Sequence, residues 1–182
     1  MKKTRWITET AVMLALLIAL QWATKPLGQI VTGSCVNTVL AVSVLFTGMS
    51  SGITVALLSP VFAYLFGIAP QLVVVPAIMI GNAVFVFVLR MLYGKPKQPV
   101  WTRISAWITS ALLKFMVLYT IVSDIICGLF APTLLEAGLL KAPMLEALPT
   151  TFALPQLLTA LIGGGLGLLL LPALRKALHR EV

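Results

Sequence analysis

Long apolar runs dominate this chain, and most of them are long enough to cross a lipid bilayer. Of its 182 residues, 60% are hydrophobic and only 10% are charged, whereas about a quarter of the residues in a soluble domain are charged. A soluble domain of this size cannot bury so much apolar surface, and a disordered chain has the opposite composition. We therefore expect one integral membrane domain over residues 1–182, whose length allows roughly five to seven spans.

Turn signals divide the sequence into six expected helices. Continuous apolar runs are not the alternating pattern of a membrane barrel, so the predicted fold is all-α. Pro60 interrupts the third span, a polar loop is expected at 25–34, and a long loop at 131–153 is expected to hold at most a short helix near 133–140. The predicted spans cover about residues 6–24, 35–48, 53–66, 72–93, 104–130 and 154–174.

The basic residues predict the orientation of the spans. With six spans, only Lys25 and Lys141 fall on the side away from the termini. The opposite side collects ten: Lys2, Lys3, Arg5, Arg90, Lys95, Lys97, Arg103, Arg175, Lys176 and Arg180. By the positive-inside rule the termini are then cytoplasmic. Because these charges sit at the ends of apolar runs, the net charge of +8 does not indicate nucleic-acid binding.

Catalysis and metal binding find little support in the sequence. The single histidine, His179, lies in the C-terminal tail, and no group of His, Cys, Asp and Glu has the spacing of a metal site. Cys35 and Cys127 lie in or beside apolar stretches and are interpreted as inert thiols. No phosphate-binding loop is present. We expect neither an enzyme nor a bound metal or cofactor.

Small residues form two stripes at helical spacing. Ala11, Ala15, Ala19 and Ala23 recur every fourth residue in the first span, which permits close approach of another helix. That helix belongs either to the same chain or to a separate membrane subunit. In the last span, Gly163 and Gly167 form a GxxxG pattern for which we expect packing within the chain.

Two polar residues lie deep in predicted spans. Lys114 and Asn82 both fall near the midplane of the bilayer, where they can hydrogen-bond each other. A charge in hydrocarbon is costly, so an intramembrane lysine indicates a functional site by default. Lys114 is either a structural tie to Asn82 and nearby carbonyls or the floor of an anion-binding cavity.

Further polar and aromatic residues gather at the outer ends of the spans. A mostly apolar pocket with a few placed polar groups is what a small-molecule site requires. The predicted substrate-binding residues are Trp22, Lys25, Gln29, Asn37, Gln71, Asn82, Lys114, Tyr119 and Gln156, with Gln21, Ser34, Ser123 and Thr159 on the same rim. Trp22 and Tyr119 can also be simple interfacial anchors. The two lysines favour a substrate with a carboxylate or another acceptor-rich group, on a flat or apolar body that Trp22 and Tyr119 cover.

Over essentially its whole length the chain resembles the S components of energy-coupling factor (ECF) transporters. The resemblance rests on the alanines at 11, 15 and 19, on the stretch from Leu45-Phe46-Thr47-Gly48 to Pro60, and on Phe152-Ala153-Leu154-Pro155-Gln156 before a glycine-rich last helix. It implies a prokaryotic, multi-pass cell-membrane protein that binds a vitamin or related micronutrient from outside. It also implies docking through Ala11, Ala15 and Ala19 to a membrane coupling subunit, with two ATPase subunits supplying energy. A structural scaffold of the MreD type, which has similar length and span number, remains the alternative.

Overall fold

The computed structural model describes residues 2–68, 71–94 and 98–178, and all regular structure in these segments is helical. The long helices are α1 (Lys2–Thr24), α2 (Gln29–Val42), α3 (Met49–Leu65), α4 (Val75–Leu92), α5 (Val100–Tyr119) and α8 (Leu154–Ala177). Shorter elements are η1 (Lys25–Leu27), η2 (Ser43–Thr47), η3 (Leu72–Val74), η4 (Thr120–Leu129), α6 (Ala131–Glu136) and α7 (Ala142–Thr151). Of these, η2 and η4 are π-helical continuations of α2 and α5.

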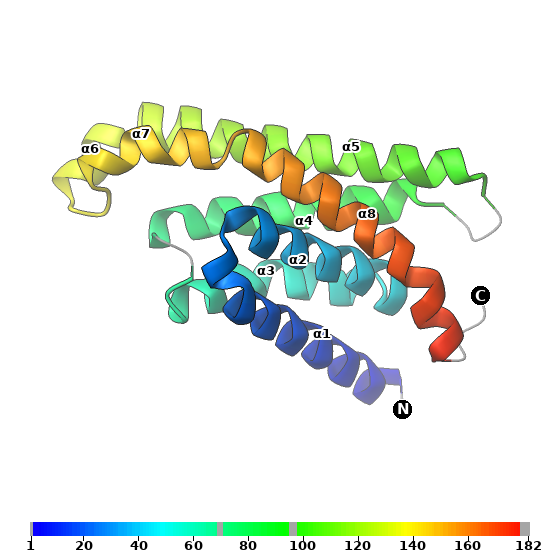
Figure 1. Ribbon diagram of the computed structural model, residues 1–182. Helices are drawn as coiled ribbons and strands as arrows, with labels where there is room; N and C mark the ends of the chain where they lie inside the picture. Colours follow the sequence, from blue (N-terminus) through cyan, green and yellow to red (C-terminus); the bar gives the residue numbers. More distant parts are fainter. Residues whose placement is uncertain (1, 69–70, 95–97, 179–182) are drawn as a thin grey trace.

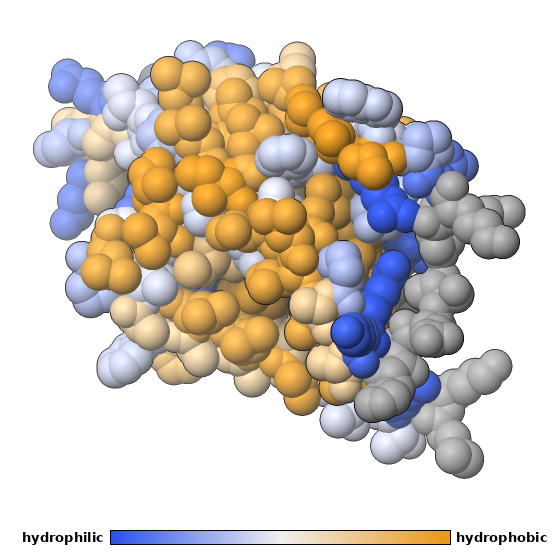
Figure 2. Space-filling view, turned by 45° about the vertical axis from the view of Figure 1, so that its right-hand side comes forward, coloured by the Kyte–Doolittle hydropathy of each residue, from blue (hydrophilic) through white to orange (hydrophobic). Residues whose placement is uncertain are grey.

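Five helical segments are long and apolar enough to cross a membrane. They are Thr4–Leu27, Gln29–Thr47, Leu72–Leu92, Val100–Leu129 and Ala142–Ala177, and the shorter apolar helix Met49–Leu65 accompanies them. Figure 2 shows the matching surface, a broad apolar face with hydrophilic residues toward its ends. The all-α prediction is confirmed, and these segments indicate a multi-pass membrane protein. The count of six crossings stays a prediction.

The helices run back and forth along one bundle. α2 packs against α1 and α8, while α4 packs against α3 and α5. The core between them contains the fully buried side chains of Leu40, Phe85 and Leu89. The start of α1 and the end of α8 lie at the same end of the bundle (Figure 1). Which side of the membrane that end faces remains a prediction, and Lys95, Lys97, Arg180 and the side chains of Lys2 and Lys3 lie outside the described part of the chain.

The predicted loops are shorter in the structure. The prediction of a polar loop at 25–34 is wrong, because residues 25–27 form η1 and α2 already begins at Gln29. The turn between the second and third helices narrows to Gly48, whose φ of 111° suits a residue without a side chain. Pro60 lies inside a continuous α3 rather than dividing it. The expected loop at 131–153 contains two helices, α6 and α7.

The glycines of α8 allow it to lie directly on α2. A Cβ atom at Gly163 would collide with the backbone oxygen of Ser34 and lie 2.6 Å from the Cβ of Asn37, and one at Gly167 would lie 2.7 Å from the Cβ of Ala41. The expected packing of the GxxxG pattern within the chain is therefore confirmed. This contact also fixes the position of Asn37.

Gly163→Ala is expected to destabilise the fold, because its methyl group would meet backbone that cannot move aside. Overpacking of this kind costs about 1–3 kcal/mol. Gly128→Ala is the matched control, since a Cβ there would lie 3.4 Å from the Ser123 carbonyl oxygen, an ordinary contact. Thermal unfolding in detergent should show a lower midpoint for Gly163→Ala alone. Equal midpoints for both variants would contradict the tight α2–α8 contact.

Candidate functional site

A cavity of about 360 Å³ lies between the helices. It is lined from the last turns of α1 and α3, the first turns of α2, α4 and α8, the middle of α5, the end of α7, η1 and the connection after α3. These helix ends belong to the end of the bundle opposite the start of α1 and the end of α8 (Figure 1). Its size falls in the range of small-molecule sites.

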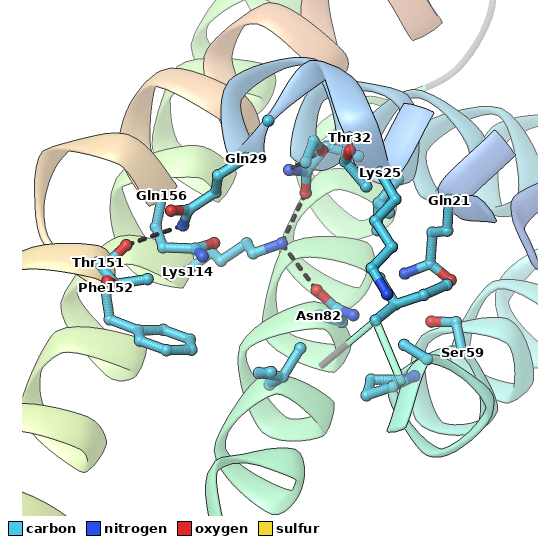
Figure 3. A pocket seen from close by; sticks show the side chains of 18 residues that line it. Gln21, Lys25, Gln29, Thr32, Ser59, Asn82, Lys114, Thr151, Phe152 and Gln156 are labelled. Atoms are coloured by element: carbon cyan, nitrogen blue, oxygen red, sulfur yellow. Dashed lines mark hydrogen bonds between the residues drawn. The ribbon is translucent and has the colours of Figure 1, made fainter. Parts of the chain in front are cut away.

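Lys114 of α5 reaches into this cavity and is only 2% exposed. Its Nζ donates hydrogen bonds to Oδ1 of Asn37, at 2.6 Å, and to Oδ1 of Asn82, at 2.7 Å (Figure 3). The predicted bond between Lys114 and Asn82 is therefore confirmed, and Asn37 is a second acceptor. An ammonium group has three donors, so one donor is left without a hydrogen-bond acceptor among the described residues, and the ring centroid of Phe85 lies 5.5 Å from Nζ.

Asn37 is held so that its oxygen faces the lysine. Its Nδ2 donates to the backbone oxygen of Gly33, at 2.9 Å, and to Oγ1 of Thr159 in α8, at 3.4 Å. Oγ1 of Thr159 in turn donates to the backbone oxygen of Gln156, at 3.0 Å. The amide of Asn37 thus has both ends engaged, which fixes the acceptor before any ligand arrives.

No carboxylate compensates the charge of Lys114 in the part of the chain that the structure describes. Glu9 pairs with Arg5, and Asp124 is exposed on η4; neither carboxylate lines the cavity. The two amide oxygens supply dipoles but no negative charge. An ammonium ion buried in this way is costly, so a ligand that carries a negative charge would stabilise it.

Two polar side chains connect helices across the rim of the cavity. Nζ of Lys25 donates to the backbone oxygen of Gly67, which ties η1 to the connection after α3 at 2.7 Å. Nε2 of Gln29 donates to the backbone oxygen of Thr151, which ties α2 to α7 at 2.9 Å. Together these two bonds tie η1 to the connection after α3 and the start of α2 to the end of α7.

Two polar atoms on the wall of the cavity are buried without a hydrogen-bond partner. They are Oε1 of Gln21, on α1, and Oγ of Ser59, on α3. Gln21 is 7% exposed and Ser59 is 1% exposed. Native structures rarely leave such atoms unsatisfied, and both belong to residues that line the cavity.

The structure brings together six of the nine predicted binding residues. Those that line the cavity are Lys25, Gln29, Asn37, Asn82, Lys114 and Gln156. Trp22, Gln71 and Tyr119 do not line it. Trp22 is 71% exposed, and Tyr119 is 38% exposed and contacts Phe115. The expected aromatic cover by Trp22 and Tyr119 is therefore wrong, and Phe152 is the aromatic residue of the lining.

Sequence reasoning missed several lining residues. Ser59, Thr32, Thr151 and Phe152 all line the cavity. Ser59 could have been identified from the sequence. A serine beside a proline in an apolar helix places a hydroxyl group where the backbone hydrogen bonding is already interrupted. Thr151 and Phe152 could not have been identified, because the sequence indicated a loop there.

The alanine stripe of α1 faces away from the rest of the chain. Ala11, Ala15, Ala19 and Ala23 are all exposed. The inner face of α1 is formed by other residues: Leu17 is fully buried, and Oγ1 of Thr10 donates to Oγ of Ser51 in α3 at 2.9 Å. The interpretation of the stripe as a contact with another helix of the same chain is therefore wrong within the described residues.

No protein-family model, curated protein or solved structure matches this chain. Within the described residues, the fold and the site define a helical protein with five helices apolar enough to cross a membrane and a cavity of small-molecule size that contains a buried lysine.

Proposed function

We propose that this protein is the substrate-binding S component of an ECF-type importer. In this role it captures a vitamin or a related micronutrient outside the cell membrane and delivers it to a coupling and ATPase module. The observation that carries the proposal is the cavity around Lys114, at the end of the bundle away from the start of α1 and the end of α8. By the distribution of basic residues that end is the extracellular one.

The second support comes from α1. Its exposed alanine stripe offers a surface on which another membrane helix can approach closely, and such packing is the main attraction between helices in lipid. We assign Ala11, Ala15 and Ala19 to docking on a membrane coupling subunit, which in turn engages two ATPase subunits. The chain itself performs no catalysis in this proposal.

A structural scaffold of the MreD type explains the helices but not the cavity. A scaffold gains nothing from an uncompensated lysine, because a buried charge without a carboxylate partner lowers stability. A site that awaits an anion accounts for the same feature. The cavity therefore favours substrate capture.

Small molecules that co-purify with the protein test this proposal. We expect denaturation of the purified protein to release one dominant compound in near-equal amount to the protein, identified by mass spectrometry. Ile78→Trp is the control, because Ile78 lines the cavity and the larger ring would occupy it. An Ile78→Trp preparation with unchanged thermal stability should release none of the compound. A wild-type protein that releases nothing specific would contradict substrate capture.

A further inference from the structure

The charges around the cavity are all of one sign. Its described lining contains two lysines, Lys25 and Lys114, and no aspartate, glutamate, histidine or cysteine. No carboxylate is available there to pair with an amine or a quaternary ammonium group, and no ligand set is available for a metal ion. The lining therefore disfavours cationic substrates and metal cargo.

The number of buried charges indicates the charge of the substrate. Lys114 is buried and has one donor free, whereas Lys25 is exposed at the rim and already donates to Gly67. A single desolvated cation is balanced by a single negative charge, while a second negative charge would be buried without compensation. This favours a carboxylate over a phosphate dianion. The amides of Asn37 and Asn82 orient the ammonium group toward that carboxylate.

A second set of polar side chains lines the cavity apart from Lys114. Oε1 of Gln21 is an acceptor without a partner, and Oγ of Ser59 can donate or accept. In Figure 3 these two side chains lie together on the far side of Lys25 from Lys114. An acceptor that is buried in this way favours a ligand with a neutral O–H or N–H group, since the unpaired state costs free energy.

The remainder of the lining is largely apolar and contains little aromatic surface. Val36, Ala63, Ile78, Pro60 and Phe152 belong to it. Flat ring systems are usually held by several aromatic side chains, which this lining lacks. Aliphatic side chains suit an aliphatic body.

We infer that the cavity binds an aliphatic monocarboxylate that carries a neutral hydrogen-bond donor at its other end. Lys114 forms an ion pair with the carboxylate. Gln21 and Ser59 accept a hydrogen bond from the neutral donor group. The inference rests on the proposed function, because it names the class of compound that the capture subunit takes.

Four probes of equal chain length test the inference by calorimetric titration of the purified protein: 6-hydroxyhexanoate, hexanoate, 6-hydroxyhexanamide and 6-amino-1-hexanol. We expect 6-hydroxyhexanoate to bind at least about tenfold more tightly than its amide, and the amino alcohol to show no binding. Gln21→Leu should remove the preference for 6-hydroxyhexanoate over hexanoate and leave hexanoate binding unchanged. Gln71→Leu is the matched control, because Gln71 does not line the cavity, and it should behave as the wild type.

The outcomes separate this inference from the proposed function. An amide or amino alcohol that binds as tightly as the carboxylate would overturn the inference. If none of the probes binds, the identity of the compound that co-purifies tests the inference. A monocarboxylate supports the inference. A cation, a metal or a neutral compound overturns it, while the proposal of substrate capture stands. If no small molecule binds or co-purifies at all, both proposals fail.

Discussion

Ala15→Trp is expected to abolish uptake while substrate binding to the isolated protein stays nearly unchanged. Ala15 is exposed on α1, in the middle of the alanine stripe, and does not line the cavity. An indole at this position holds the partner helix away from the α1 backbone, and close backbone approach is what small residues provide in membranes. Uptake of the co-purifying compound into cells or proteoliposomes that contain the coupling module, beside titration of the isolated protein, measures the two effects separately.

Leu112→Trp supplies the control for bulk on a lipid-facing surface. Leu112 is 42% exposed on α5, and the same indole there should leave uptake intact. Uptake that survives Ala15→Trp would remove the docking assignment of the stripe. Loss of uptake together with loss of binding would show instead that Ala15 supports the fold.

Lys114→Met is expected to weaken substrate binding by about one to two orders of magnitude, which corresponds to roughly 1.5–3 kcal/mol, the usual value of a charge-assisted hydrogen bond. Methionine preserves much of the length of the side chain and removes the ammonium group that faces the cavity. Binding is measured by calorimetric titration with the compound that co-purifies.

Lys25→Met is the comparison for this experiment. Lys25 is exposed and donates to Gly67, and a rim charge is partly screened by salt, so its loss should cost less affinity. Equal affinities for wild type and Lys114→Met would assign Lys114 to a structural tie between Asn37 and Asn82. The anionic-substrate hypothesis would then depend on Lys25 alone.

The helices were predictable because composition determines them directly. A long apolar run with few charges has few alternatives to a helix in lipid, so the runs that became α4 and α8 could be placed within a few residues. The ends were less predictable. Gln29 to Ser34 are polar enough to indicate a loop, yet they form the first turns of α2, where Gln29, Thr32 and Gly33 line the cavity.

The residues at the centre of the site were predictable from their depth in the membrane alone. The residues that line the rest of the cavity were not. Lys114 and Asn82 could be paired because both fall near the midplane and each needs a polar partner. Trp22 and Tyr119 were chosen for their depth, but both are exposed and neither lines the cavity. The depth of a residue follows from counting along the helix. The direction of its side chain depends on the rotation of the helix about its axis, and that rotation is determined by packing contacts such as the one at Gly163.

The unequal lengths of neighbouring helices have a consequence for the surrounding lipid. α3 has 17 residues, or about 26 Å at 1.5 Å per residue, which is less than the roughly 30 Å of bilayer hydrocarbon. α5 and η4 together have 30 residues. If α3 crosses the bilayer, lipid chains beside its exposed Leu58 and Leu65 shorten or tilt to match it, and this hydrophobic mismatch costs a fraction of a kcal/mol per Å. Because α3 packs against α1, the partner proposed to dock on α1 would displace lipid beside this short helix, and membrane elasticity would then favour assembly more strongly in thicker membranes.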